Sequence, residues 1–173
     1  MTATDPLLRA LAHPVRLRIV SLVWNVPLSA AELARELGIS HALASQHLRR
    51  LDAVGLVELA EVRSNHGGRE RRYRAVHGSP LSDQRHEAAP LLAEALAGNL
   101  RDRVARRAPD AEGVTSDAEL WVSPETWTDF RHRLAALVDE LHGAAQAPHA
   151  PGTVGIGVTV MVFPLAEPAG PNG

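Results

Sequence analysis

The chain has 173 residues, a formal net charge of −2 and no cysteine. The lack of cysteine excludes disulfides, thiolate metal ligands and thiol chemistry, and no run of 18 apolar residues is present to span a membrane. The N-terminal stretch "MTATDPLLRA" lacks the basic and apolar regions of a secretory signal, so we expect a cytoplasmic protein with no membrane partner.

The charge is divided unevenly between the two halves of the chain. Residues 1–80 contain eleven arginines and seven carboxylates, a net charge of +4, whereas residues 81–173 contain seven arginines and thirteen carboxylates, a net charge of −6. This asymmetry favours a polyanionic partner for the first half alone. The alternative is a chance distribution of charge over solvated surfaces.

Two short helices are predicted at the N-terminus. The first covers residues 5–12, and Pro14 suits the first turn of the second. "NVP" at residues 25–27 ends the second helix. Its apolar face at helical spacing consists of Val15, Ile19, Leu22 and Val23.

Residues 29–54 are predicted to form two helices with a very short turn between them. Ser29 and Glu32 have the spacing of a capping box, and Gly38 suits a left-handed end of the first helix. Ser40 can cap the second helix almost at once. The connection "LGIS" is therefore typical of a helix-turn-helix.

The second of these helices has two contrasting faces. Ala44, Leu48 and Leu51 recur at helical spacing and predict a buried stripe, and Gly55 ends the helix. The residues on roughly the opposite side are Ala42, Ser45, Gln46 and Arg49. This polar side is either a solvated surface or a face that is presented to a partner.

A β-hairpin is predicted directly after the second helix. Residues 56–63 and 69–76 are rich in strand-forming residues, and the intervening "SNHGG" is rich in turn formers. The alternation of the first strand slips by one residue before Val62. The arginines of this hairpin are Arg63, Arg69, Arg71, Arg72 and Arg74.

A longer helix is predicted over residues 84–107. Pro90 either kinks this helix or lies in the first turn of a helix that starts near Ala89. Residues 108–117 are polar and predict a linker. The apolar positions of the helix are Leu91, Leu92, Ala95, Leu96 and Leu100.

The last part of the chain is predicted to form a β-α-β unit over residues 118–163. Strands are expected at 118–122 and 153–163, and "SPE" at 123–125 is a strong start for a helix that runs to about residue 143. Residues 164–173 are predicted to be a disordered tail. Because two strands make a poor sheet, we expect the unit to pack on the rest of the chain or to pair with a second copy, and we hypothesise that it extends a dimer interface.

A helix-turn-helix followed by a basic hairpin is typical of a winged helix. Helix 40–54 is predicted to read bases in the major groove of double-stranded DNA, while hairpin 63–74 contacts phosphates or the minor groove. The predicted DNA-binding residues are Ser40, His41, Ala42, Ser45, Gln46, His47, Arg49, Arg50, Arg63, His66, Arg69 and Arg71. Packing within the domain is an alternative role for His47, and a turn role for His66.

Four stretches carry a resemblance to a known family: "LAHPVRLRIV" (11–20), "AAELARELGIS" (30–40), "SQHLRRLDAVGLVE" (45–58) and "RERRYRAV" (69–76). Over about residues 5–80 the chain resembles the ArsR/SmtB-type winged-helix repressors. The resemblance implies a homodimer that reads a two-fold-related operator, and repression that an inducer relieves. It also implies pairing of the first and last helices of the domain, whose apolar residues are Leu7, Leu8, Leu11, Leu91, Leu92, Leu96 and Leu100.

The predicted fold is mainly α with small β. Its parts are a winged helix-turn-helix DNA-binding domain (1–80), a long dimerisation helix (81–107), a linker (108–117), a C-terminal β-α-β extension (118–163) and the tail (164–173).

The chain departs from the metal-sensing members of that family. It has no cysteine, and Asp83 is followed by Arg85 at the expected ligand position, with His86 one residue late. The remaining histidines do not pair at helical spacing, with His132 and His142 expected on the surface of the last helix. We therefore expect no metal site and no cofactor, and a histidine-based metal sensor is the weaker alternative.

Other functions stay open beside DNA binding. The winged helix is alternatively a protein-association module for an acidic partner. An enzyme is not expected, because no nucleophile, phosphate-loop or metal motif occurs. A small-molecule effector is an open possibility for a regulator; Trp121, Trp127 and Phe130 either line an apolar pocket for it or pack in an ordinary core.

Overall fold

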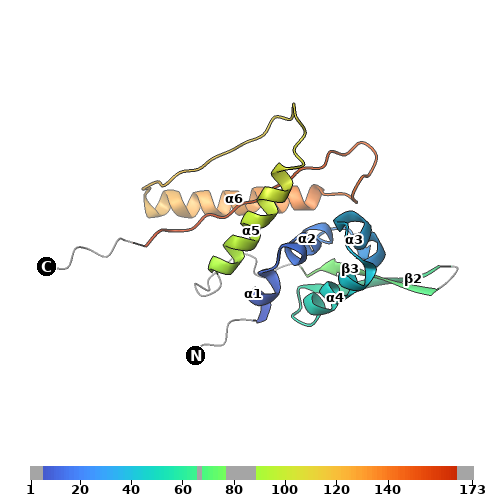
Figure 1. The fold of residues 1–173 in the computed structure, drawn as a ribbon. Helices are drawn as coiled ribbons and strands as arrows, with labels where there is room; N and C mark the ends of the chain where they lie inside the picture. Colours follow the sequence, from blue (N-terminus) through green and yellow to red (C-terminus); the bar gives the residue numbers. More distant parts are fainter. Residues whose placement is uncertain (1–5, 66–67, 77–88, 167–173) are drawn as a thin grey trace.

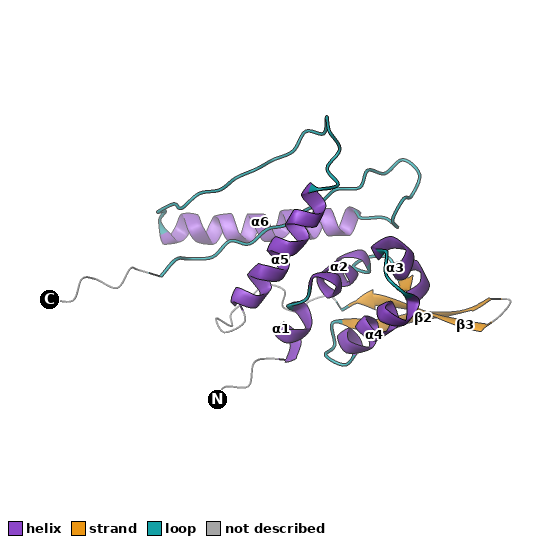
Figure 2. Ribbon diagram, viewed as in Figure 1, coloured by secondary structure: helices purple, strands orange, loops and turns teal. Residues whose placement is uncertain are grey.

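The computed structural model describes residues 6–65, 68–76 and 89–166 (Figure 1). Helices predominate, and the strands form one small sheet (Figure 2). The elements in chain order are α1 (Pro6–Leu11), α2 (Pro14–Leu22), β1 (Leu28–Ser29), α3 (Ala30–Leu37), α4 (His41–Asp52), β2 (Val57–Asn65), β3 (Gly68–Ala75), α5 (Ala89–Val104) and α6 (Pro124–Ala144).

The caps predicted for α3 and α4 are confirmed. The Ser29 hydroxyl accepts a hydrogen bond from the Glu32 amide at 3.3 Å, and the Glu32 carboxylate accepts one from the Ser29 amide at 2.8 Å. Gly38 ends α3 in the left-handed region with φ 66°, which glycine adopts without steric cost. The Ser40 hydroxyl then accepts from the Leu43 amide at 3.2 Å. These local signals fix the tight turn between α3 and α4.

The sheet is antiparallel with the strand order β1-β3-β2. Strands β2 and β3 form the predicted hairpin, hereafter the wing, which projects away from the helices (Figure 1). An irregularity between Leu59 and Glu61 in β2 accounts for the slip in alternation before Val62. The sequence analysis missed β1, which pairs Leu28 with Tyr73 and is too short to show any periodicity.

One hydrophobic core lies where α1 to α4 meet the base of the sheet. Its fully buried members include Leu33 of α3 and the stripe of α4 predicted from sequence, Ala44, Leu48 and Leu51. Its other members are Ala10, Leu11, Ile19, Val20, Val23, Leu28, Leu56, Val57 and Ala75. Burial of this set orients α4 so that its polar side faces outward.

Helix α5 packs against α1 and α2. Its Ala95 is buried, and its buried Asn99 donates from Nδ2 to the Pro14 carbonyl at 3.3 Å. The described helix begins at Ala89 with Pro90 in its first turn, while residues 84–88 of the predicted helix lie outside the described residues.

The C-terminal part forms the predicted helix but not the predicted strands. Ser123 caps α6 by accepting from the Thr126 amide at 3.1 Å, with Pro124 in the first turn. The prediction of strands at 118–122 and 153–163 is wrong, because these segments are extended without strand pairing. Their alternating sequences favour strands, yet a strand needs a neighbour to bond to, and none lies beside them in the described part of this chain.

None of the described helices combines the length and the apolar character that a membrane crossing requires. The last predicted segment, residues 164–173, is extended over 164–166, and its remainder lies outside the described residues.

Candidate nucleic-acid interface

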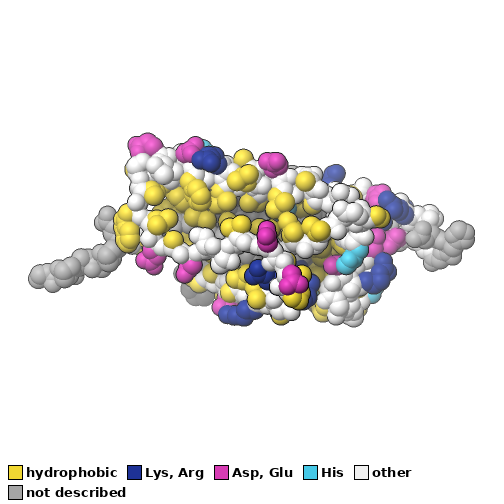
Figure 3. All heavy atoms as spheres, turned by 90° about the horizontal axis from the view of Figure 1, so that it is seen from above, with side chains coloured by type: hydrophobic (Ala, Val, Ile, Leu, Met, Phe, Trp, Pro, Cys, Tyr) yellow, Lys and Arg dark blue, Asp and Glu magenta, His cyan; other side chains and the backbone are white. Residues whose placement is uncertain are grey.

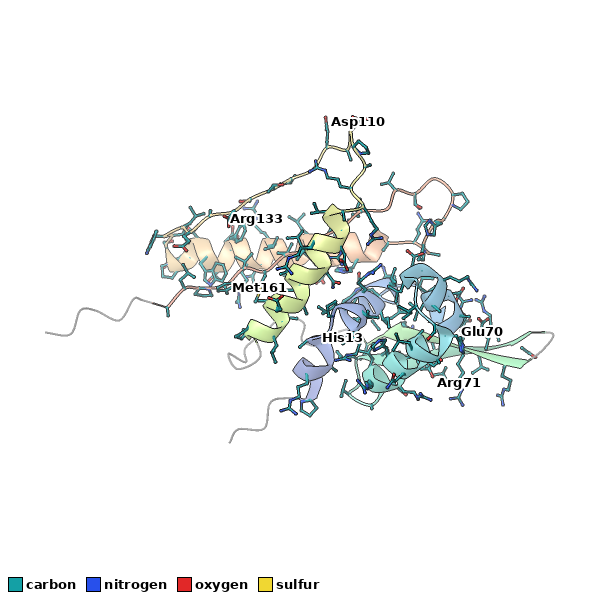
Figure 4. All side chains as sticks on the ribbon, in the orientation of Figure 1. His13, Glu70, Arg71, Asp110, Arg133 and Met161 are labelled. Carbon is teal, nitrogen blue, oxygen red and sulfur yellow. The ribbon has the colours of Figure 1, made fainter. Side chains whose placement is uncertain are left out.

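A groove of about 300 Å³ lies between α4 and β3, and we call it the α4–β3 groove. It is lined by Ser29, Ala30, Ala31, His41, Ser45, Leu48, Arg49, Arg69, Glu70, Arg71 and Tyr73. The helix-turn-helix and the wing therefore contribute to one concave surface. Figure 4 shows Arg71 and Glu70 on the wing, beside α4.

The outward side of α4 carries the side chains predicted to contact DNA. His41, Ala42, Gln46, Arg49 and Arg50 are exposed. Ser45 is half-buried at the groove, and Ser40 is exposed, although its hydroxyl already caps the helix. A helix N-terminus carries partial positive charge, so the start of α4 at the groove adds to the attraction for anions.

Two wing arginines are paired with carboxylates of β2, Arg63 from the same strand and Arg74 from the neighbouring β3. Arg63 binds Glu61 at 2.9 Å, and Arg74 binds Glu58 at 2.6 Å. All four side chains are between 36% and 55% exposed, so these pairs are solvent-screened and weak. Arg63 is therefore available to a phosphate only in competition with Glu61.

Arg72 is turned inward and has a structural role. Its guanidinium donates to the Pro27 carbonyl at 3.1 and 2.8 Å and to the Glu32 carboxylate at 3.0 Å. Only 11% of the side chain is exposed. Because Glu32 also closes the capping box of α3, this one arginine fixes the wing to the helix-turn-helix.

Three arginines at the groove are different, because they have no such partners. Within the described residues, Arg49, Arg69 and Arg71 form no ion pair, and all three are exposed. They lie on two elements that face the same groove, where Glu70 is the one lining carboxylate. The arrangement suits a polyanion that contacts the helix and the wing together.

His47 is buried, as its alternative packing role predicts. It is 4% exposed, and its ring centroid lies 4.9 Å from that of His13, at the start of α2. Burial lowers the pKa of His47, and the nearby His13, Arg16 and Arg50 lower it further. Burial, Arg16 and Arg50 likewise lower the pKa of His13. His47 is therefore a neutral packing residue at neutral pH, and a direct base contact from it does not fit this structure.

Arg16 and Arg50 border the histidine pair. Arg16 is buried and donates from Nη2 to the Arg9 carbonyl at 2.9 Å and from Nε to the Ala10 carbonyl, so it caps the end of α1. Sequence reasoning missed this role, because nothing in "HPVRLRIV" distinguishes Arg16 from Arg18.

The apolar residues predicted for dimerisation fall into separate groups. Leu11 is fully buried in the core of its own chain, so its predicted place in a dimer interface is wrong. Leu92 and Leu96 are half-buried, whereas Leu91 and Leu100 are 53% and 49% exposed on α5. The side chains of Leu7 and Leu8, and the whole of His66, lie outside the described residues.

The C-terminal aromatic and histidine side chains also depart from prediction. Trp121 is 88% exposed, so it packs in no core, and Phe130 is 47% exposed. His132 lies on the surface as expected, but His142 is half-buried against Trp24, with ring centroids 4.8 Å apart.

No trio of histidine, aspartate or glutamate side chains within the described ranges is arranged to hold a metal ion. Asp83, Arg85 and His86, which bear on the metal alternative, lie outside those ranges.

The helices, the hairpin and the groove define a winged helix-turn-helix domain. A family model described as a helix-turn-helix domain matches residues 11–60. The HTH-type transcriptional regulator YgaV of Escherichia coli strain K12 is 43% identical over 53 residues, which are 30% of this chain and 54% of that protein. The chain therefore spans about half the length of the curated relative that it matches.

Solved structures similar to this chain include two transcriptional regulators. The repressor BigR from Xylella fastidiosa is 29% identical, with a TM-score of 0.34 over 56% of this chain and 82% of that chain. The regulator HlyU from Vibrio vulnificus is 28% identical, with a TM-score of 0.34 over 55% of this chain and 83% of that chain.

Proposed function

We propose that this protein is a sequence-specific DNA-binding transcription regulator, and that it acts as a homodimeric repressor of the ArsR/SmtB type. The observation that carries the proposal is the α4–β3 groove, where three exposed arginines on two elements have no carboxylate partner among the residues that the structure describes. The match of residues 11–60 to a helix-turn-helix domain supports it.

In this proposal α4 enters the major groove. Gln46 can bond an adenine edge, and Arg49 a guanine edge or a phosphate. Ser45 can bond either base, and Ala42 can contact a thymine methyl group. Arg69 and Arg71 contact phosphates or the minor groove from the wing, which fixes the register of α4 along the DNA.

A homodimer follows from the proposed mode of reading. A two-fold-related operator is read by two α4 helices about 34 Å apart, one turn of DNA. Leu100 and Val104, four residues apart on one face of α5, are 49% and 60% exposed and leave an apolar surface that a second α5 can cover. Their exposed fractions support α5 as the pairing element of the proposed dimer.

Binding to DNA is tested by salt titration with the DNA upstream of the protein's own gene and with random DNA of equal length. We expect preference for the upstream DNA at physiological salt, and a steep loss of affinity as salt rises. Substitution of Gln46→Ala or Arg49→Ala is expected to weaken binding to the preferred DNA by about 1–3 kcal/mol, because each removes one base contact.

The matched control is Arg131→Ala, which removes an exposed arginine from α6, a helix that does not line the groove. It should leave affinity unchanged. An equal loss of DNA affinity in Arg131→Ala and Arg49→Ala would show that the loss reflects the change in net charge alone. That result would contradict the proposed docking of α4. The absence of any DNA complex at low salt would overturn the proposal in favour of protein association.

A further inference from the structure

The extended segment 153–163, "TVGIGVTVMVF", leaves apolar side chains in solvent. Val154, Ile156, Val158, Val160 and Val162 are between 43% and 83% exposed, although each is a β-branched residue suited to a sheet. Figure 3 shows hydrophobic side chains gathered over this C-terminal half of the molecule. Such a stripe is unusual on the surface of a protein that acts alone.

The two sides of the segment differ in what they touch. Arg103 of α5 donates to the Thr159 hydroxyl and to the Val158 carbonyl, both at 2.7 Å. A side chain at Gly157 would lie 3.1 Å from Arg103. At residues 157–159 the side that bears Gly157 and Thr159 therefore lies on α5, and the neighbouring valines face away from it. Further along, Met161 and Phe163 are also exposed, at 40% and 57%.

Within the described residues, the backbone of the segment is almost unpaired, with the Val158 carbonyl that accepts from Arg103 as its one contact to a side chain of α5. Among the described residues, no backbone-to-backbone hydrogen bond involves residues 154–166. Edge strands of soluble proteins are normally protected by charged side chains, prolines or bulges. Here residues 151–166 contain no charged side chain, and Pro151 and Pro164 stand only at the two ends. The stretch between these prolines is therefore an unprotected extended segment, long enough to form a strand with a partner.

A second copy of the chain fits this stretch better than a different partner. An uncharged segment offers a charged partner no complement, whereas two identical uncharged segments pair without like-charge repulsion. Arg103 also fastens the segment to α5, whose exposed Leu100 and Val104 lie on the helix proposed to pair in the dimer. A two-fold axis that pairs the α5 helices can therefore bring both copies of the segment together.

We propose that residues 153–163 pair as an antiparallel strand with the same segment of a second copy, beside the paired α5 helices. This inference rests on the proposed homodimer and names a second part of its interface. It also explains why the C-terminal sequence has strand character but forms no strand within one chain.

Amide hydrogen exchange on the full chain tests the pairing directly. In a two-stranded antiparallel ribbon every second residue bonds to the partner strand. We expect alternate amides within 154–163 to exchange at least about 100-fold more slowly than an unpaired chain when the protein is dimeric. The protection should disappear on dilution to monomer. A dimer in which all these amides exchange at the unpaired rate would overturn the inference.

Charge substitutions test the same pairing by sedimentation. Ile156→Lys and Val158→Lys place like charges close together across the strand pair, so each is expected to raise the dimer Kd at least about tenfold. Val114→Lys is the matched control, because Val114 is fully exposed in the linker. Unchanged dimer Kd values in both segment variants, with the control also unchanged, would overturn the inference.

DNA binding is measured on the same samples to separate the two proposals. A dimer that binds DNA but lacks protected segment amides overturns the strand pairing alone. Protected amides in a dimer that binds no DNA support the pairing and overturn the regulator. A wild-type chain that stays monomeric at every concentration overturns the strand pairing. Its DNA binding would still test whether the α4–β3 groove contacts DNA.

Discussion

The winged domain and the C-terminal part of this chain contain similar helix-start signals, but their helices differ in how far they are buried. Both α3 and α6 begin at a capping serine followed by a glutamate in the first turn. Yet α3 buries Leu33 completely, whereas none of the 21 residues of α6 is buried. A cap and an apolar stripe are therefore enough to predict a helix, but not to predict what the helix packs against.

The difference lies in the neighbours available within the chain. The stripe of α4 meets α2, α3 and the sheet, which bury it from several directions. Helix α6 contacts the winged domain through His142, whose carbonyl accepts from the Asn25 amide and whose ring lies against Trp24, and the loop after α6 adds His149 to Glu36 at 2.9 Å. Such contacts position α6 but contribute little hydrophobic stabilisation.

The largest effect expected from this comparison is in the core. Leu48→Ala should lower the free energy of unfolding by about 2–5 kcal/mol, because Leu48 is 1% exposed and its removal leaves a cavity. Leu137→Ala in α6, at 62% exposure, should change it by less than about 0.5 kcal/mol in the monomer. Denaturant unfolding at low protein concentration measures both, and similar losses would show that α6 belongs to the cooperative core.

The sequence predicted the parts of the fold that local chemistry determines. The capping box at Ser29, the left-handed Gly38 and the buried stripe of α4 all follow from residues a few positions apart. The strand at 153–163 did not form, because strand pairing depends on a neighbour that no local pattern specifies.

The candidate site also divides into a part that local sequence patterns predict and a part that depends on distant residues. Helical periodicity predicts which side of α4 faces outward, and Gln46 and Arg49 are exposed as it predicts. The run of wing arginines could not be sorted by sequence, since Arg71 and Arg72 differ only in which side of β3 they occupy. The inward contacts of Arg72 depend on Pro27 and Glu32, which are 45 and 40 residues away.

A smaller effect separates these two adjacent arginines. Arg72→Ala should lower the free energy of unfolding by about 1–3 kcal/mol, because it leaves the Pro27 carbonyl and the Glu32 carboxylate without this donor. Arg71→Ala should leave stability within about 0.5 kcal/mol and lower the salt dependence of DNA binding by about one phosphate contact. Thermal unfolding and salt titration of both variants distinguish them, and a stability loss in Arg71→Ala alone would contradict the assignment.

The smallest expected effect is a pH dependence within the winged domain. Burial, together with Arg16 and Arg50, lowers the pKa of both His13 and His47. Below the ordinary histidine pKa of about 6.5 the unfolded chain therefore binds more protons than the folded chain, and the free energy of unfolding falls as pH is lowered. Unfolding measured between pH 7.5 and 5.5 should show this loss.

The contribution of the pair is isolated by substitution. His47→Gln removes one of the two histidines with a lowered pKa, so its free energy of unfolding should fall less steeply over the same pH range than that of the wild type. His132→Gln, at an exposed position on α6, should keep the wild-type slope. The slope is compared rather than the absolute stability, because the substitution also changes packing against His13. An unchanged slope in His47→Gln would mean that His47 titrates normally, and that its burial in the winged domain is looser than that of the α4 stripe beside it.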